Sequence, residues 1–153
     1  MFHVVLVAPE IAPNTGNIAR TCAVTGARLH LVRPLGFRLS DRMLRRAGLD
    51  YWQHVDWTVH DTLDELLAAL PAQRFCYLTP AASQRYTDFA FQPGDALVFG
   101  SESRGLPPDL PRRRPGPQLR VPMRPGLRSL NLASTVALVL YEAYRQHGFP
   151  GMV

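Results

Sequence analysis

Short, unbroken runs of apolar residues recur along the chain and alternate with segments in which apolar residues are spaced three and four apart. The apolar runs predict strands at 2–8, 28–34, 74–80, 96–100 and 119–123. Runs of this kind are typical of parallel strands that are covered on both faces. The pattern therefore favours a buried, mainly parallel sheet.

The segments between these strands predict helices that begin and end at recognisable capping residues. The predicted helices are 17–27, opened by Asn14 or Thr15 and closed near Gly26; 39–51, capped by Ser40 and ended by Gly48; 62–70; and 130–148. The segment 107–118 contains too many prolines for more than one helical turn. Strands and helices that alternate over 153 residues predict one α/β domain covering 1–153, with helices flanking the sheet.

The last predicted helix has apolar residues around almost its whole circumference. They are Leu132, Val136, Leu138, Val139, Leu140, Tyr141 and Tyr144. A helix that is apolar all round must be buried all round. We therefore expect a homodimer formed through this helix; the alternative is a helix inserted against the sheet of its own chain.

The net charge is +5, the isoelectric point is near 9.9, and all 17 basic residues are arginine. The absence of lysine excludes Schiff-base chemistry and the lysine of a P-loop. Arginine offers planar donor forks that bind phosphate in a bidentate manner, which makes nucleic acid a candidate partner. The alternative is a solvated basic surface without such a partner.

Several other classes of function have no support in the sequence. Cys22 and Cys76 form no CxxC, and the five histidines lack ligand spacing, so no metal site is expected. The sequence contains neither GxGxxG after the first strand nor the GxSxG of a nucleophile elbow. No signal peptide or membrane span is recognisable, so we expect a soluble, cytoplasmic protein.

Candidate chemistry lies in three stretches, each at the carboxyl end of a predicted strand. They are PNTGNIART (13–21), LVFGSESRGLP (97–107) and VPMRPGLRSLNLAST (121–135). Open α/β sheets bind their ligands at that edge. The glycines in these stretches allow close backbone approach, Glu102 can accept hydrogen bonds and Arg104 can reach a phosphate. Taken singly, each residue also fits ordinary turn chemistry.

In order and spacing, these stretches resemble the three signature motifs of the SPOUT superfamily of RNA 2′-O-ribose methyltransferases. The resemblance covers residues 2 to about 150. It implies an α/β sheet with a C-terminal deep trefoil knot, made by the strands around 75–79, 96–100 and 119–122 with the terminal helix. It also implies S-adenosylmethionine as methyl donor, without a metal.

The resemblance assigns roles to individual residues. It implies that Leu78, Gly100, Glu102, Val121, Ser129 and Leu130 bind the cofactor. Arg20 matches the catalytic arginine, and the substrate-binding candidates are Asn14, Arg45, Arg46, Arg104, Arg128 and Asn131. Further candidates for a phosphate track are Arg112, Arg113, Arg114 and Arg124. On the residues alone, Leu78 and Val121 also fit a core strand, Arg20 a surface ion pair, and Asn14 and Asn131 helix caps.

Within the superfamily, the short chain, RRAGLDYW (45–52) and PGLRSLNL most resemble the bacterial enzymes that methylate the wobble cytidine or uridine of tRNA. The implied partner is the anticodon stem-loop, with leucine tRNAs as expected substrates. Two alternatives remain: a SPOUT methyltransferase acting on another tRNA or rRNA position, and a catalytically silent RNA-binding dimer.

Overall fold

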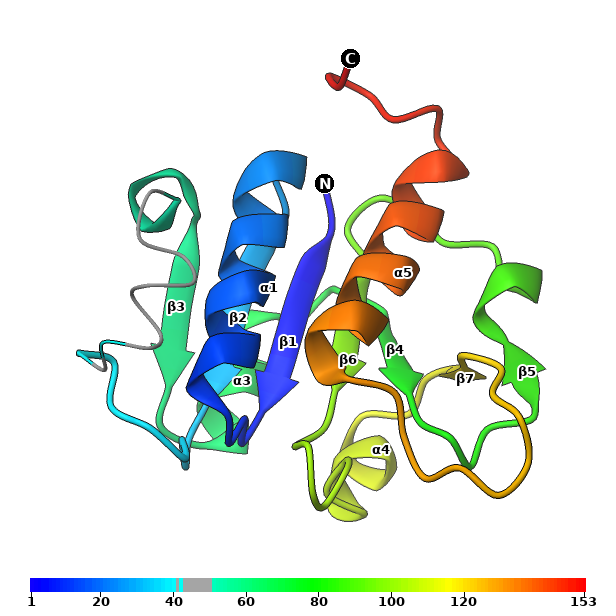
Figure 1. Cartoon of the computed structure of the whole chain (residues 1–153), viewed down its shortest axis with the longest axis horizontal. Coiled ribbons are helices and arrows are strands. Elements are labelled where there is room, and N and C mark those ends of the chain that lie inside the picture. Colours follow the sequence, from blue (N-terminus) through cyan, green and yellow to red (C-terminus); the bar gives the residue numbers. More distant parts are fainter. Residues whose placement is uncertain (41, 43–50) are drawn as a thin grey trace.

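The computed structural model describes residues 1–40, 42 and 51–153. In this part of the chain, seven strands form one parallel sheet in the order β3-β2-β1-β6-β4-β7-β5 (Figure 1). The strands are β1 (His3–Val7), β2 (Arg28–Val32), β3 (Trp57–His60), β4 (Phe75–Leu78), β5 (Gln84–Arg85), β6 (Ala96–Phe99) and β7 (Gln118–Arg120). The prediction of an α/β fold with a mainly parallel sheet is confirmed.

The five predicted apolar runs coincide with β1, β2, β4, β6 and β7. Every residue of β1, β4 and β6 is buried, as expected for strands covered on both faces. β3 and β5, which the sequence does not predict, are the two edge strands. Trp57 and Thr58 of β3 and both residues of β5 are exposed. An edge strand of this kind needs no apolar run, which explains why the pattern misses it.

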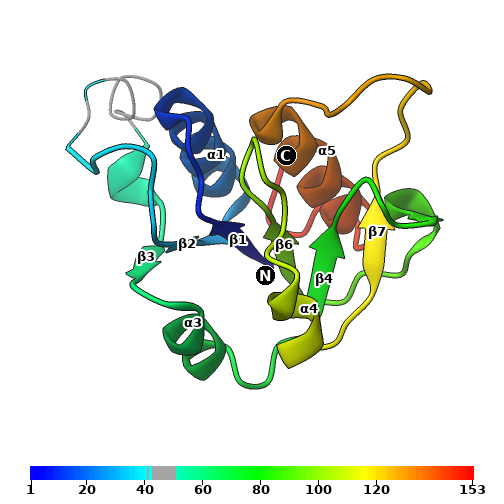
Figure 2. The ribbon, with the colours of Figure 1, turned by 90° about the horizontal axis from the view of Figure 1, so that it is seen from below.

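Helices cover both faces of the sheet. They are α1 (Ala12–Thr25), α3 (Leu63–Ala69), α4 (Asp109–Arg113) and α5 (Leu132–Arg145), with 3-10 turns at Trp52–His54 (η1) and Tyr86–Asp88 (η2). Figure 2 shows α1 and α5 on one side of the sheet, and α3 and α4 on the other. The short α4 agrees with the single turn expected in the proline-rich segment.

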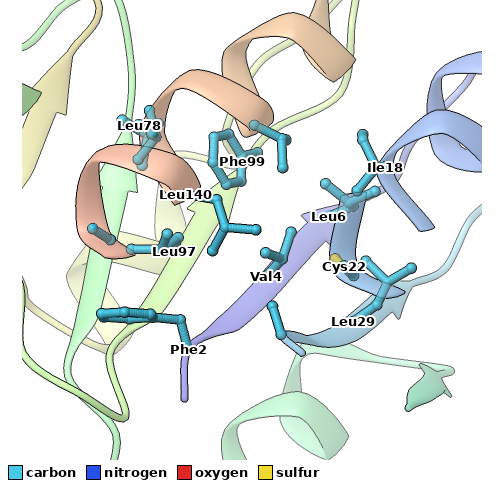
Figure 3. Packing of buried hydrophobic residues seen from close by; sticks show 14 of the residues in the cluster. Phe2, Val4, Leu6, Ile18, Cys22, Leu29, Leu78, Leu97, Phe99 and Leu140 are labelled. Carbon is cyan, nitrogen blue, oxygen red and sulfur yellow. The ribbon is translucent and has the colours of Figure 1, made fainter. Parts of the chain in front are cut away.

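The core consists of two apolar layers, one on each face of the sheet. Alternate residues of β1 belong to the two layers: Val4 packs in the layer with α1 and α5, and Val5 in the layer with α3 and α4. Figure 3 shows the first layer, where Ile18 of α1 and Leu140 of α5 lie over the sheet. Cys22 and Cys76 are free, and burial raises the pKa of each thiol to about 12.

The predicted start of α1 is wrong. The helix begins at Ala12, with Pro13 in its first turn, so Asn14 and Thr15 lie inside it and are buried. Ile11 is the N-cap residue and contributes no side-chain hydrogen bond. Proline is well suited to a first turn because the amide hydrogen that it lacks has no partner inside the helix. The cap of α1 must therefore come from another part of the chain.

The other helix ends agree more closely with the sequence. Thr62 caps α3, and Gly26 closes α1 at a φ of 78°. Most of the predicted helix 39–51, including its end at Gly48, lies outside the described residues. None of the described helices is long and apolar enough to cross a bilayer.

Candidate functional site

The carboxyl edge of the sheet holds a cavity of about 440 Å³. Its walls come from the start of α1, the residues after β4, the loop after β6, the segment after β7 and the start of α5. These segments meet because the carboxyl ends of neighbouring parallel strands share one edge of the sheet. The volume falls within the range of small-molecule sites.

The structure brings most of the predicted site residues together at this cavity. All six cofactor candidates line it: Leu78, Gly100, Glu102, Val121, Ser129 and Leu130. Four substrate candidates line it as well: Asn14, Arg104, Arg128 and Asn131. Arg45 and Arg46 lie outside the described residues. Arg20 is described and does not line the cavity.

Gly100 is required by the close approach of the loop that follows β6. A Cβ atom at Gly100 would lie 2.0 Å from the carbonyl carbon of Gly105. Ser101 and Gly105 pair across this loop, with backbone N to O distances of 3.2 and 3.0 Å, and Gly105 has a φ of 71°. The two glycines therefore allow a tight loop that keeps its backbone at the cavity wall.

Glu102 provides the missing cap of α1. Its carboxylate accepts hydrogen bonds from the backbone N of Glu10 and of Ile11, each at 2.8 Å. It also accepts one from Nδ2 of Asn14 at 3.3 Å. A carboxylate at a helix N-terminus is favoured by the free amide hydrogens and by the helix dipole. Both oxygens of Glu102 are thus engaged in joining the loop after β6 to α1.

Asn14 and Asn131 extend this network to the second helix. Nδ2 of Asn131 donates to Oδ1 of Asn14 at 3.0 Å, while Oδ1 of Asn131 accepts from the backbone N of Ser134 at 3.1 Å. Asn131 is thus the N-cap of α5 as well as part of the cavity wall. The network fixes the N-termini of α1 and α5 relative to each other.

Glu10 and Ser103 form a second link between the same loops. The Glu10 carboxylate accepts hydrogen bonds from the backbone N of Ser103 at 3.1 Å and from its hydroxyl at 2.6 Å. These bonds lower the pKa of Glu10 from its ordinary value. The link adds to the attachment of the loop after β6 to the start of α1.

Arg20 lies on the exposed side of α1, six residues beyond Asn14, which is about 9 Å along a helix axis. Its guanidinium carbon lies 4.6 Å from the centre of the Tyr51 ring, a cation–π contact. Arg20 forms no ion pair with a carboxylate of the described residues. The surface ion pair that was its structural alternative is therefore not found within the described chain.

Three arginines of the expected phosphate track lie on or directly after α4 and do not line the cavity: Arg112, Arg113 and Arg114. Arg113 is paired with Asp64. Arg114 donates to the carbonyl oxygens of Leu70, Pro71 and Gln73 at 2.6 to 3.0 Å and lies 4.5 Å from the centre of the Phe75 ring. Arg114 therefore contributes to holding the loop before β4.

Sequence reasoning missed several residues of the cavity wall. These include Ile11, Thr79, Pro80, Met123 and Thr135. Thr79 and Pro80 directly follow β4, so their place at the carboxyl edge was a signal that could have identified them. The capping role of Glu102 had no such signal, because Glu102 is separated from Ile11 by 91 positions.

Comparison with known proteins agrees with this fold. The sequence profile of the SpoU rRNA Methylase family matches residues 1–141. The chain therefore belongs to the SpoU rRNA methylase family, which confirms the resemblance carried by the three motifs. It is also 57% identical, over 99% of each chain, to the tRNA (cytidine(34)-2'-O)-methyltransferase of Burkholderia ambifaria.

Two solved structures are close in fold. One, described as "Structural insights into the 2-OH methylation of C/U34 on tRNA", has a TM-score of 0.92 and 49% identity over 97% of each chain. The other is an rRNA methyltransferase from Sinorhizobium meliloti with bound S-adenosylmethionine. It has a TM-score of 0.83 and 27% identity over 94% of this chain and 56% of its own.

Proposed function

We propose that this protein transfers a methyl group from S-adenosylmethionine to the 2′-hydroxyl of the wobble nucleotide, cytidine or uridine 34, of tRNA. The observation that carries the proposal is one cavity lined by all six expected cofactor residues and four expected substrate residues. The full-length relative from Burkholderia ambifaria is named for this reaction. A tRNA substrate implies that the protein works in the cytoplasm, and leucine tRNAs are the first isoacceptors to test.

The chemistry of the cavity fits S-adenosylmethionine. Leu78 and Val121 contribute apolar walls suited to the adenine ring, and the tight loop at Gly100 offers backbone atoms at close range. Ser129 and Leu130 line the cavity next to the network residue Asn131. Bound there, the cofactor would supply an electrophilic methyl group. The task of the chain is then to hold the ribose hydroxyl in line with it.

We propose that Arg20 acts on the RNA rather than on the cofactor, because it lies outside the cavity wall. A guanidinium stays protonated at neutral pH and is a poor base. It can hold a phosphate and stabilise the negative charge that develops on the 2′-oxygen. The hydroxyl proton would pass to an oxygen of that phosphate as the new carbon–oxygen bond forms and the carbon–sulfur bond breaks.

The reaction is tested by transfer of tritiated methyl groups from S-adenosylmethionine to bulk tRNA, followed by mapping of the labelled nucleoside. Label on the 2′-oxygen of nucleotide 34 is expected. Label at another RNA position would replace the proposed substrate while keeping the enzyme class. Binding of RNA without any binding of S-adenosylmethionine would instead indicate the silent dimer.

Substitution of Arg20 tests its role separately. Arg20→Lys keeps the charge and loses the planar fork, so we expect kcat to fall about 100-fold or more, with S-adenosylmethionine affinity unchanged. The measurement is a pH–rate profile beside that of Arg145→Lys, a matched control on α5 whose partner is Glu142. Near-full activity of Arg20→Lys would exclude the assigned role.

We also propose that the C-terminal part of the chain forms the trefoil knot expected from the resemblance. β7 lies beyond β4, at the far side of the sheet from β1. The chain must return from there to α5, which contacts β6 and α1. The returning segment and the loop after β6 both line the cavity. These features support a segment threaded past that loop.

A homodimer is the proposed assembly. Large apolar side chains of α1, α5 and the residues beside them are exposed by 42 to 51%: Ile11, Val24, Leu138 and Tyr141. α1 and α5 pack against each other on the same face of the sheet (Figure 2). Exposed apolar surface on two adjacent helices is typical of a protein interface. A second copy of the chain would cover it.

A further inference from the structure

A second cavity, of about 600 Å³, adjoins the first at the edge of the sheet. Four arginines line this cavity, which we call the arginine pocket: Arg85, Arg120, Arg124 and Arg128. Its described wall contains no acidic residue. Pro80, Met123 and Arg128 line both cavities, so the arginine pocket is continuous with the proposed cofactor site.

Two arginines of this pocket are neighbours across the sheet. Arg85 of β5 pairs in register with Arg120 of β7. Register partners on these adjacent parallel strands place their side chains on the same face of the sheet. Two like charges on one face repel each other. The two strands are only two and three residues long. Strands this short contribute little to the stability of the sheet, so the fold itself does not explain why two positive charges lie side by side there.

Little of this charge is neutralised within the described chain. Arg85 is paired with Asp88 at 2.9 Å, and both side chains are more than half exposed. Arg120, Arg124 and Arg128 form no ion pair with a described carboxylate. Four guanidinium groups thus share one bonded carboxylate around a cavity. This arrangement attracts an anion with several acceptor oxygens.

We propose that the arginine pocket binds a backbone phosphate of the RNA substrate, next to the nucleotide whose ribose enters the cofactor cavity. The proposal rests on the proposed function and names the part of the protein that holds the adjoining phosphate. In Figure 1 the segment that follows β7 passes beside β5 before it reaches α5. The pocket borders the cofactor cavity because Pro80, Met123 and Arg128 line both. The proposal adds Arg85 and Arg120 to Arg124 and Arg128, which the sequence already indicates as candidates for binding RNA.

The test measures binding of an anticodon stem-loop RNA by fluorescence anisotropy over a range of salt concentrations. The variants are Arg85→Gln with Arg120→Gln, and Arg120→Lys. The matched control is Arg28→Gln, which removes one positive charge from β2, where Arg28 is paired with Asp56. Calorimetric titration with S-adenosylmethionine on each variant shows whether the cofactor site is intact.

For the double variant we expect about tenfold weaker RNA binding, or more. The slope of log Kd against log salt should fall by about 0.7 to 0.9 for each phosphate that the variant no longer binds. Arg28→Gln should keep the wild-type slope, and Arg120→Lys, which keeps the positive charge, should retain most of it. The affinity for S-adenosylmethionine should be unchanged in all variants. These results together would support binding of an RNA phosphate in the arginine pocket.

Two results would overturn the proposal. An unchanged RNA affinity and salt slope in the double variant would show that no phosphate is held there. A loss of S-adenosylmethionine affinity with unchanged RNA binding would assign the pocket to the carboxylate of the cofactor. Failure of the wild-type protein to methylate nucleotide 34 is a separate result that concerns the proposed function. Wild-type protein that binds no RNA would refute both proposals.

Discussion

At the scale of single residues, Glu102 shows how one side chain can serve both the fold and the site. Its carboxylate takes the place of an N-cap that Ile11 does not provide. In Glu102→Gln, one oxygen becomes an amide that cannot accept a hydrogen bond, so a backbone amide or Asn14 loses its acceptor. We expect a loss of about 1–3 kcal/mol in the free energy of unfolding, measured by urea denaturation.

The control for this substitution is Asp61→Asn, which breaks the surface pair with Arg33, in which the Asp61 side chain is 71% exposed. A pair of that kind contributes about 1 kcal/mol or less. S-adenosylmethionine affinity should also fall in Glu102→Gln and not in Asp61→Asn, because only Glu102 lines the cavity. Equal effects of the two substitutions on stability would refute the capping role of Glu102.

At the scale of elements, β1, β2 and β3 are joined by a row of three buried histidines. Nδ1 of His3 lies 3.0 Å from Nε2 of His30, and Nδ1 of His30 lies 3.0 Å from Nε2 of His60. Burial, followed by the charge of its histidine neighbours, lowers the pKa of His30 from 6.5 to about 4. Burial also lowers the pKa of His3 and of His60.

These shifts predict that acid destabilises the sheet. Below pH 6.5 the unfolded chain takes up protons that folded His30 accepts only near pH 4, so stability falls as the pH falls through this window. The share of His30 is at most about 2 kcal/mol at pH 5. Urea denaturation at pH 7.5 and 5.0 should show a smaller loss in His30→Gln than in wild type. His54→Gln, at an exposed histidine, should behave as wild type; a loss in His30→Gln as large as in wild type would contradict the prediction.

The same elements show how far the sequence determines the fold. The apolar runs identify the buried strands because β1, β4 and β6 must be apolar on both faces. They miss β3 and β5 because an edge strand with exposed residues has no such requirement. The start of α1 could not be placed because its cap, Glu102, comes from a loop near β6 rather than from the adjacent sequence.

At the scale of the whole molecule, the predicted convergence of the three motifs follows from topology. Parallel strands bring their carboxyl ends to one edge, so motifs that follow β6 and β7 and one that opens α1 meet there. The arginine pocket could not be predicted in this way. The register that places Arg85 beside Arg120 joins two strands far apart in sequence, one of which has no apolar signal.

The assembly can be tested by one substitution on the exposed face of α5. Leu138 is 43% exposed, between the buried Val136 and Val139. Leu138→Glu should leave the monomer folded, because the side chain already faces outward, and should place two like charges in a symmetric interface. We expect the mass measured by light scattering to fall from that of two chains to that of one. Ala68→Glu adds the same charge on α3, on the other face of the sheet, and should leave the mass unchanged.

Binding measurements on the Leu138→Glu variant test whether the second copy contributes to RNA binding. If the second copy helps to present the RNA, the Leu138→Glu monomer should bind S-adenosylmethionine with wild-type affinity and lose most of its affinity for the stem-loop. The cavity is lined by residues of one chain, so binding of S-adenosylmethionine should not require the second copy. A wild-type protein that is already monomeric at micromolar concentration would contradict the interface and leave the apolar side chains of α1 and α5 to another partner.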